Sequence, residues 1–348
     1  MSWEVGFGSA SSIASGPFRW SLRSAGPDRW RLALHRSVIG ATSALRLRGG
    51  LTLSRWLQRI VGDYAAPLTA EAGRDIRLSF PGFDRYWMRV FFRNDSYEPE
   101  LYHWFRRIAR PGDFALIDGG ANIGFWSALL TSQEFGIARA VAIEASPTTY
   151  AELCRTAALC GGRFATEHRA LTAAPGPVSF EQGVAHASRH IIAPDRAPDP
   201  APDRGPGAAP GSQTVTVEGT TVDALVARHG FDPAFLLVKL DVEGAELASV
   251  TGGAAALAGG AIFLYEDHGK DPRSELTGQL LALGADCWFI ADDGAMIAVD
   301  SAAAASRWKL DPRRGYNFVC TSRSYARAHP LAARLAGGAP ATSANTSS

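Results

Sequence analysis

An acidic residue followed at once by a glycine-rich turn is the feature of this sequence best suited to chemistry. The turn, Asp118 to Gly124, follows an apolar run at 114–117 that predicts a buried strand. A second apolar run at 141–143 ends on Glu144. Ligands of an open parallel sheet bind beyond the carboxyl ends of its strands, where a carboxylate can accept hydrogen bonds from ribose hydroxyls. The spacing therefore indicates a site for a nucleoside-containing cofactor.

The positions of the glycines help to distinguish between cofactors. A pyrophosphate-binding turn requires the pattern G-x-G-x-x-G, but this turn has Gly119, Gly120 and Gly124. Asp118 would also bring negative charge close to a pyrophosphate, which disfavours a nicotinamide-dependent oxidoreductase. A carboxylate at the tip of a strand suits a positively charged ligand, such as the sulfonium and amino group of S-adenosyl-L-methionine.

Two separate segments resemble the hallmarks of one enzyme family. Asp118 to Gly124 resembles the first motif of class I methyltransferases in its FkbM form, and Leu237 to Leu247 resembles the second hallmark of that family. The likeness extends from Tyr97 to Cys320. It departs from the family pattern at Gly119, where an apolar residue is frequent, and in a proline-rich insertion. The resemblance implies a methyltransferase that depends on S-adenosyl-L-methionine.

The resemblance also implies an α/β fold, with a doubly wound, mostly parallel sheet of the class I methyltransferase type. Apolar runs at 287–290 and 316–320 would form its antiparallel edge pair. We expect short strands over 76–92 and one helix over 244–257, with Asp223 as a capping residue. The helix that begins near Pro99 has an apolar face, which consists of Leu101, Trp104, Phe105 and Ile108.

The same resemblance assigns residues to the cofactor. The first motif and the acidic residue on the next strand would hold the cofactor's methionine and ribose. Ala170 falls where the family has a turn close to the adenine, and Tyr97 and Glu98 match a family segment that leads into the first motif. An ordinary helix start, where a carboxylate favours the positive end of the dipole, is the other interpretation of Glu98. The expected cofactor residues are Asp118, Gly120, Asn122, Gly124, Glu144, Ala170, Tyr97 and Glu98.

Candidate catalytic residues follow two predicted strands. Asp241 and Glu243 follow one of them, and Glu266 and His268 follow the next. The family is associated with hydroxyl acceptors on small molecules or glycans, and a hydroxyl that is methylated must lose its proton to a base. We predict Asp241 as the base or the acceptor-positioning carboxylate. His268 is the alternative base, because an unperturbed histidine has a pKa near 6.5.

Charged residues at the same strand ends allow two further expectations. Lys239 and Asp241 are two residues apart in a predicted strand, so both should project to the same side, where they could form an ion pair. Asp241 and Glu266 could instead bind magnesium, as in metal-dependent O-methyltransferases. The FkbM resemblance does not require a metal, so we expect none. Nucleic acid is not an expected partner, because the methyltransferase portion is net acidic.

Positive charge is concentrated at the start of the chain. The 348 residues have a formal net charge of +1, but residues 1–60 contain nine arginines and two acidic residues, a net charge of +7. We expect a basic extension over 1–70, a methyltransferase domain over 71–323 and a flexible tail over 324–348. The proline-rich stretch at 193–212 should be a disordered insertion. The four cysteines show no ligand spacing, which favours a reduced, cytoplasmic protein.

An apolar stripe with helical spacing lies within the basic extension. It consists of Leu53, Trp56, Leu57, Ile60 and Val61. The interpretation that we favour is a helix that packs this stripe on the catalytic domain. The alternative is a peripheral contact of residues 53–61 with an anionic membrane. A non-catalytic, membrane-associated module that keeps the cofactor fold is the second rival to the enzyme.

Overall fold

The structure, a computed structural model, describes most of the chain between residues 64 and 322 and part of what precedes it. The proline-rich insertion at 193–212, the tail after 323 and His268 lie outside the described residues. Within the described segments, every helix is too short or too polar to cross a membrane. The described residues are 17–24, 28–44, 56, 59–60, 62, 64–82, 84–93, 96–109, 112–182, 213–267, 273–310 and 315–322.

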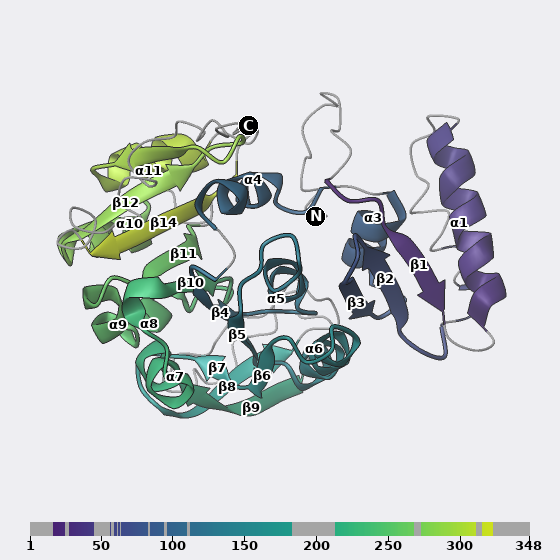
Figure 1. Cartoon of the computed structure of the whole chain (residues 1–348), viewed down its shortest axis with the longest axis horizontal. Coiled ribbons are helices and arrows are strands. Elements are labelled where there is room, and N and C mark those ends of the chain that lie inside the picture. The colour runs from purple at the N-terminus through teal and green to yellow at the C-terminus, as the bar shows by residue number, and fades with distance from the viewer. Residues whose placement is uncertain are drawn as a thin grey trace, which may run out of the picture.

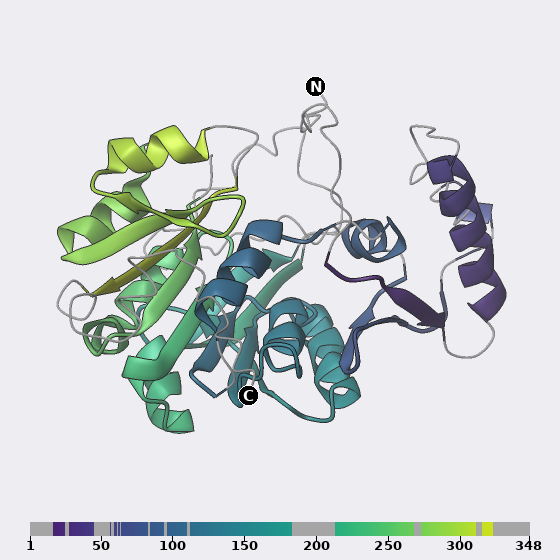
Figure 2. The same ribbon diagram turned by 45° about the horizontal axis from the view of Figure 1, so that its top comes forward.

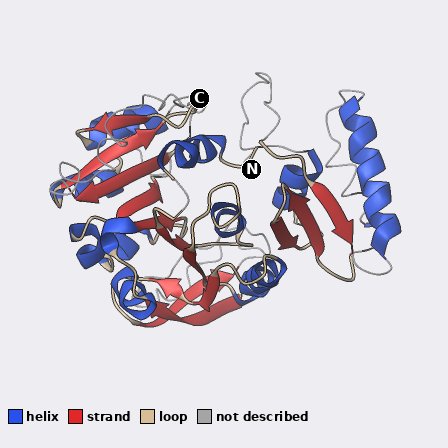
Figure 3. Ribbon diagram, viewed as in Figure 1, coloured by secondary structure: helices blue, strands red, loops and turns tan. Residues whose placement is uncertain are grey.

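A sheet of eight strands forms the centre of the molecule (Figures 1 and 3). In chain order these strands are β4 (Ala115–Gly119), β5 (Arg139–Glu144), β6 (Ala165–His168), β10 (Leu236–Leu240), β11 (Ile262–Glu266), β12 (Ala285–Ile290), β13 (Met296–Val299) and β14 (Asn317–Ser322). They lie in the order β13-β12-β14-β11-β10-β4-β5-β6. Neighbouring strands are parallel among β11, β10, β4, β5 and β6. The pairs β11–β14, β14–β12 and β12–β13 are antiparallel. The predicted fold of class I methyltransferase type is confirmed.

Helices cover both faces of this sheet because neighbouring residues of a strand point to opposite faces. In β4, Leu116 belongs to one buried cluster and Ile117 to the other, and Leu237 and Val238 alternate in the same way in β10. Strands buried on both faces need apolar residues at nearly every position, as the apolar runs predict. The first cluster includes residues of α4 (Pro99–Ile108), α5 (Phe125–Leu130) and α6 (Pro147–Leu159). The second includes residues of α7 (Val222–His229), α8 (Glu246–Thr251), α9 (Ala254–Ala258), α10 (Glu275–Ala282) and α11 (Ala302–Lys309).

Two smaller sheets accompany the central one. The first is antiparallel and contains β1 (Ser21–Ser24), β2 (Leu68–Ala72) and β3 (Ile76–Phe80), with α1 (Arg29–Ala44) and α3 (Arg85–Arg93) nearby. The boundary predicted after residue 70 falls inside β2, which pairs with β3 along its length. The second contains β7 (Ala170–Leu171), β8 (Gly176–Gln182) and β9 (Gln213–Thr220). Figures 1 and 2 place α1 at the opposite end of the molecule from β12 and α11.

The predicted apolar face of α4 is confirmed, because Leu101, Trp104, Phe105 and Ile108 are its buried residues. Two other predictions are wrong in part. Only 76–80 of the segment 76–92 is a strand, and Arg85–Arg93 is the helix α3. Helical spacing brings Trp87 and Phe91 onto one face of α3, where both are buried against the core, and their rings stack with a centroid distance of 5.4 Å.

The helix predicted over 244–257 is broken into α8 and α9 at Gly252 and Gly253. A Cβ on Gly252 would overlap the Thr172 carbonyl oxygen, and one on Gly253 would lie 2.8 Å from a ring carbon of Phe263. Close packing at the break therefore requires both glycines. Asp223 is a capping residue, as predicted, but its carboxylate accepts from Ala255 N and Ala256 N at 3.0 and 2.8 Å and so caps α9.

The apolar stripe expected to pack on the catalytic domain does not do so where it is described. Trp56 and Ile60 are 58% and 61% exposed. Arg59, in the same helical segment, is exposed as well. The favoured interpretation, a helix that covers the domain with this stripe, is therefore wrong for these two residues. Leu53, Leu57 and Val61 lie outside the described part of the chain.

The cap supplied by Asp223 leads to a prediction for stability. The residue before α9 is Gly253, which has no side chain to cap the helix, so Asp223 is the substitute. Asp223→Ala should lower the free energy of unfolding by about 1–2 kcal/mol, measured by urea denaturation. Asp223→Asn keeps one acceptor oxygen and should lose about half as much. Equal losses for the two variants would contradict the capping role.

Candidate functional site

The two family-like segments meet at the carboxyl ends of β4 and β10. These strands are neighbours, with Gly119 opposite Leu240, and Asp241 N donates to Gly119 O at 3.0 Å. Gly120 has a φ of 70°, and a Cβ there would overlap the Asp241 carbonyl oxygen. The chain reverses its winding direction between β4 and β10, which is where open α/β sheets bind ligands.

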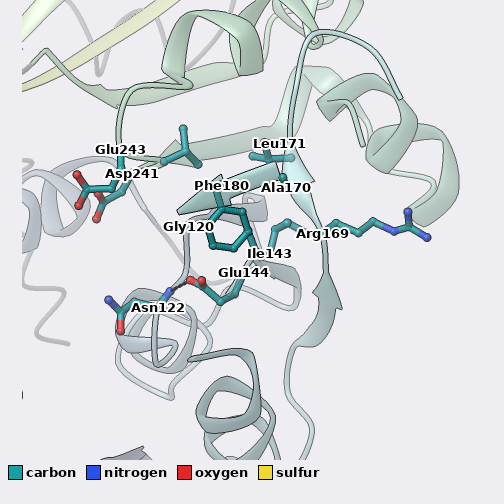
Figure 4. Close-up of a pocket in the computed structure, with 12 residues that line it drawn as sticks. Gly120, Asn122, Ile143, Glu144, Arg169, Ala170, Leu171, Phe180, Asp241 and Glu243 are labelled. Atoms are coloured by element: carbon teal, nitrogen blue, oxygen red, sulfur yellow. Dashed lines mark hydrogen bonds between the residues drawn. The ribbon is translucent and has the colours of Figure 1, made fainter. Parts of the chain in front are cut away.

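A pocket opens at this point (Figure 4). Four of the expected cofactor residues line it, namely Gly120, Asn122, Glu144 and Ala170, as do two of the expected catalytic residues, Asp241 and Glu243. The other predicted residues that the structure describes, Asp118, Gly124, Tyr97, Glu98 and Glu266, do not line it. The full lining is Gly120, Asn122, Ile143, Glu144, Ala145, Arg169, Ala170, Leu171, Phe180, Asp241, Val242 and Glu243.

Backbone amides fix the carboxylate of Glu144. Its Oε2 accepts from Asn122 N at 3.0 Å and its Oε1 accepts from Ser146 N at 2.8 Å. The first bond joins the end of β5 to the motif turn, where Asn122 has a φ of 54°. Two backbone donors from different segments therefore fix the orientation of this carboxylate at the pocket wall.

Asp118 has a structural role that the sequence did not predict. Its Oδ2 accepts from Ser127 N at 3.1 Å and from Ser127 Oγ at 2.6 Å, in the first turn of α5. The residue before α5 is Gly124, so Asp118 supplies the cap that glycine lacks. No described residue donates to its Oδ1. Burial raises the pKa of Asp118, and the nearby Lys239 acts in the opposite direction.

Lys239 and Asp241 form the predicted ion pair, with Nζ and Oδ2 3.2 Å apart. The lysine side chain is almost completely buried, whereas that of Asp241 is 22% exposed. Burial alone would lower the pKa of Lys239, but four carboxylates raise it, so the lysine stays charged. These carboxylates belong to Asp241, Glu98, Asp118 and Glu266.

Glu98 and Glu266 form a carboxyl pair next to this lysine. Glu98 has a left-handed backbone, with a φ of 43°, and its Oε2 accepts from Trp126 Nε1 at 2.7 Å. Burial raises the pKa of Glu266 well above its usual range, and the negative charges of Asp241 and Glu98 raise it further. A side-chain hydrogen bond with Glu98 raises this pKa as well, so the protonated form of Glu266 is favoured. A neutral acid is a donor and a poor base, which leaves Asp241 as the better candidate base.

Tyr97 packs among aromatic rings and does not line the pocket. Its centroid lies 4.8 Å from Phe125, 5.3 Å from Trp87 and 6.0 Å from Trp126. Burial raises the pKa of Tyr97 well above its usual range, with the Glu98 charge acting in the same direction. Tyr97 therefore joins α3 to α5, and its neighbour Glu98 reaches the polar cluster.

The described His, Cys, Asp and Glu residues include no group of three or more that could hold a metal ion. All four cysteines are free thiols. His268, the alternative base, belongs to the segment 268–272 that the structure does not describe. Its preceding residue is firmly held, because Asp267 forms a buried ion pair with Lys309 at 2.7 Å and accepts from Thr277.

A comparison with known families identifies the part of the chain that contains this site. The family model of the methyltransferase FkbM domain matches residues 118–285. Residues 118–285 therefore resemble this domain and are called the FkbM domain below. The predicted FkbM resemblance is thereby confirmed.

The chain is also similar to a solved structure. The crystal structure of methyltransferase FkbM from Methylobacillus flagellatus KT aligns with 14% sequence identity and a TM-score of 0.36. The alignment covers 64% of this chain and 50% of that one, so this chain matches half the length of its structural relative. No curated protein matches the sequence.

One wall of the FkbM domain's pocket is formed by a residue that the sequence did not predict as part of the site. Phe180 in β8 is 3% exposed and forms a small buried cluster with Ala170 and Val217. The alternation of Val178, Ser179 and Phe180 predicts which side Phe180 faces. The sequence contains no signal that β8 and β9 fold over the end of β5, because that arrangement depends on contacts between distant segments.

The turn of the FkbM domain allows a matched test of close packing. Gly120 and Gly161 have nearly the same φ, 70° and 71°, but a Cβ on Gly161 would have no neighbour within 4 Å. Gly161→Ala should therefore lower the free energy of unfolding by only about 1–2 kcal/mol, from backbone strain. Gly120→Ala should lose about 2 kcal/mol more, because its Cβ overlaps the end of β10. Similar urea midpoints for the two variants would contradict this contact.

Proposed function

We propose that the FkbM domain binds S-adenosyl-L-methionine in the pocket of Figure 4 and transfers its methyl group to a hydroxyl on a small molecule or glycan. The observation that carries the proposal is the Glu144 carboxylate, held by two backbone amides at the pocket wall. A fixed pair of acceptor oxygens suits the two adjacent hydroxyls of a ribose. Its place beside the β4–β10 switch point is where a nucleoside cofactor is expected.

The remaining pocket residues fit the other parts of this cofactor. Ile143, Leu171 and Phe180 give an apolar wall for a purine base. Asp241 and Glu243 bring carboxylates to the same pocket, which favours the cationic sulfonium and amino groups. A dinucleotide would instead place its negative pyrophosphate against these carboxylates. The charge of the pocket therefore favours S-adenosyl-L-methionine over a nicotinamide cofactor.

The bound cofactor supplies an electrophilic methyl group, and the protein must position the acceptor and remove one proton. Transfer of this methyl group to the acceptor oxygen would break the carbon–sulfur bond and leave its electron pair on sulfur. The hydroxyl proton then needs a base, and Asp241 is the carboxylate that both lines the pocket and carries an ion-pair partner. Lys239 holds the Asp241 side chain in place from the buried side. Glu266, as a neutral acid, donates to Glu98 and helps to position that cluster.

The role of Glu144 is tested by calorimetric titration with S-adenosylhomocysteine. Glu144→Gln replaces the charged acceptor and should weaken binding by about tenfold. Glu167→Gln is the matched control. Glu167 lies in the neighbouring strand β6, opposite Ile143, but it bonds to Arg228 and His229 and does not line the pocket. The control should bind with unchanged affinity. Binding of NADH in place of S-adenosylhomocysteine would overturn the proposal.

The division of roles between carboxyl groups is tested by turnover. Asp241→Asn removes the base and should lower kcat by about a hundredfold or more. The Kd for S-adenosylhomocysteine should change far less, because its thioether lacks the sulfonium charge. Glu266→Gln imitates the neutral acid and should keep most of the activity. The rate is measured as S-adenosylhomocysteine formation, with an acceptor found by screening hydroxyl-bearing sugars and small molecules. An inactive Glu266→Gln beside an active Asp241→Asn would reverse the assignment.

A further inference from the structure

Three large apolar side chains are exposed in the basic N-terminal region. Trp30 in α1 is 53% exposed, and Trp56 and Ile60 are 58% and 61% exposed. Trp56, Arg59 and Ile60 follow the spacing i, i+3, i+4, so they share one side of a helical segment. An exposed tryptophan side chain is energetically unfavourable in water, and exposed apolar groups are frequent where a protein contacts a membrane or a partner protein.

Short chain distances bring these side chains together. A Cβ on Gly62 would lie 3.8 Å from Nη2 of Arg31, and the Arg31 guanidinium lies 5.0 Å from the centroid of the Trp30 ring. Two residues of chain span at most about 7 Å, so Ile60 is close to the Arg31 end of α1. Trp30 and the Trp56–Ile60 segment therefore belong to one region of the surface.

Exposed arginines accompany these apolar groups in the N-terminal region. Arg29, Arg36 and Arg59 are exposed, and no carboxylate among the described residues pairs with any of them. Elsewhere in the same region the acidic residues are already paired, as Glu71 is with Arg23 and Asp28 with Arg31. The net charge of +7 over residues 1–60 extends this imbalance along the sequence.

The inner side of α1 is firmly attached, so its outer side is a stable platform. Leu32 and His35 are buried, and His35 Nδ1 lies 3.2 Å from the Tyr64 hydroxyl. Ala65 N donates to the buried Asp28 carboxylate at 2.6 Å. Figures 1 and 2 show α1 at one end of the molecule, with its outer side turned away from the central sheet.

We propose that this surface, defined by Trp30, Trp56, Ile60, Arg29, Arg36 and Arg59, binds the face of an anionic phospholipid bilayer. Tryptophan is suited to the interface between headgroups and acyl chains, and arginine to lipid phosphates. The contact is peripheral, with apolar side chains inserted and arginines at the level of the headgroups. It would hold the FkbM domain at a membrane surface while its pocket lies on another part of the molecule.

The test uses the full chain and vesicles of equimolar phosphatidylcholine and phosphatidylglycerol, with pure phosphatidylcholine vesicles for comparison. Cosedimentation should show binding to the anionic vesicles that weakens as salt is added. Trp56→Ala/Ile60→Ala should weaken this binding by about tenfold or more, and Arg29→Gln/Arg36→Gln by about tenfold or more. The matched controls remove exposed leucines or arginines elsewhere, as Leu283→Ala/Leu310→Ala and Arg273→Gln/Arg307→Gln, and should bind like the unchanged chain.

Three results would overturn the proposal. The first is no binding to the anionic vesicles at low salt. The second is equal loss in the control variants, which would mean a general effect of charge or apolar surface. The third is preferential binding of a DNA or RNA duplex in competition with the vesicles, which would assign the surface to nucleic acid. Unchanged calorimetric binding of S-adenosylhomocysteine by every variant separates this surface from the pocket.

Discussion

The site depends on the contact between Gly120 and the Asp241 carbonyl group. These residues belong to two motifs more than a hundred positions apart, and they meet because β4 and β10 are neighbouring parallel strands. The absence of a side chain at Gly120 lets the motif turn reach the end of β10. From there Asn122 N reaches Glu144 at the end of β5, so a single close approach sets the positions of three strand ends. The positions of the pocket walls depend on this close approach of Gly120 to Asp241.

A buried cation, Lys239, balances part of the negative charge beside the pocket. Lys239 pairs directly with Asp241, one of its four acidic neighbours, and the raised pKa of Glu266 favours the neutral form of that residue. Isolated buried charges are costly, so this arrangement is stable only as a unit. The carboxyl groups of Asp241, Glu98 and Asp118 outnumber this single cation, which leaves a net negative charge beside the pocket. A cationic ligand reduces that imbalance, and an anionic one increases it, which is the physical basis for preferring a sulfonium cofactor.

The sequence predicts those parts of the site that depend on local order. Alternation and spacing within one strand gave the Lys239–Asp241 pair, and the turn motif gave the positions of Gly120 and Glu144. Long-range packing decided the rest. Phe180 lines the pocket because the antiparallel pair β8 and β9 packs beside the end of β5. Trp56 and Ile60 are exposed although their spacing is equally typical of a core-facing helix. A periodic pattern identifies an apolar side but not what covers it.

Strained backbone is concentrated at the same site. Among the described residues, four other than glycine have a positive φ, and three of these, Glu98, Asn122 and Glu243, lie in the pocket or its neighbouring polar cluster. A left-handed conformation costs about 1–2 kcal/mol for such a residue. Hydrogen bonds hold two of them in place, from Trp126 to Glu98 and from Asn122 to Glu144. The backbone strain thus orients polar groups around one pocket and lowers the stability of the fold. Such strain is expected where a ligand and a reacting atom must be aligned.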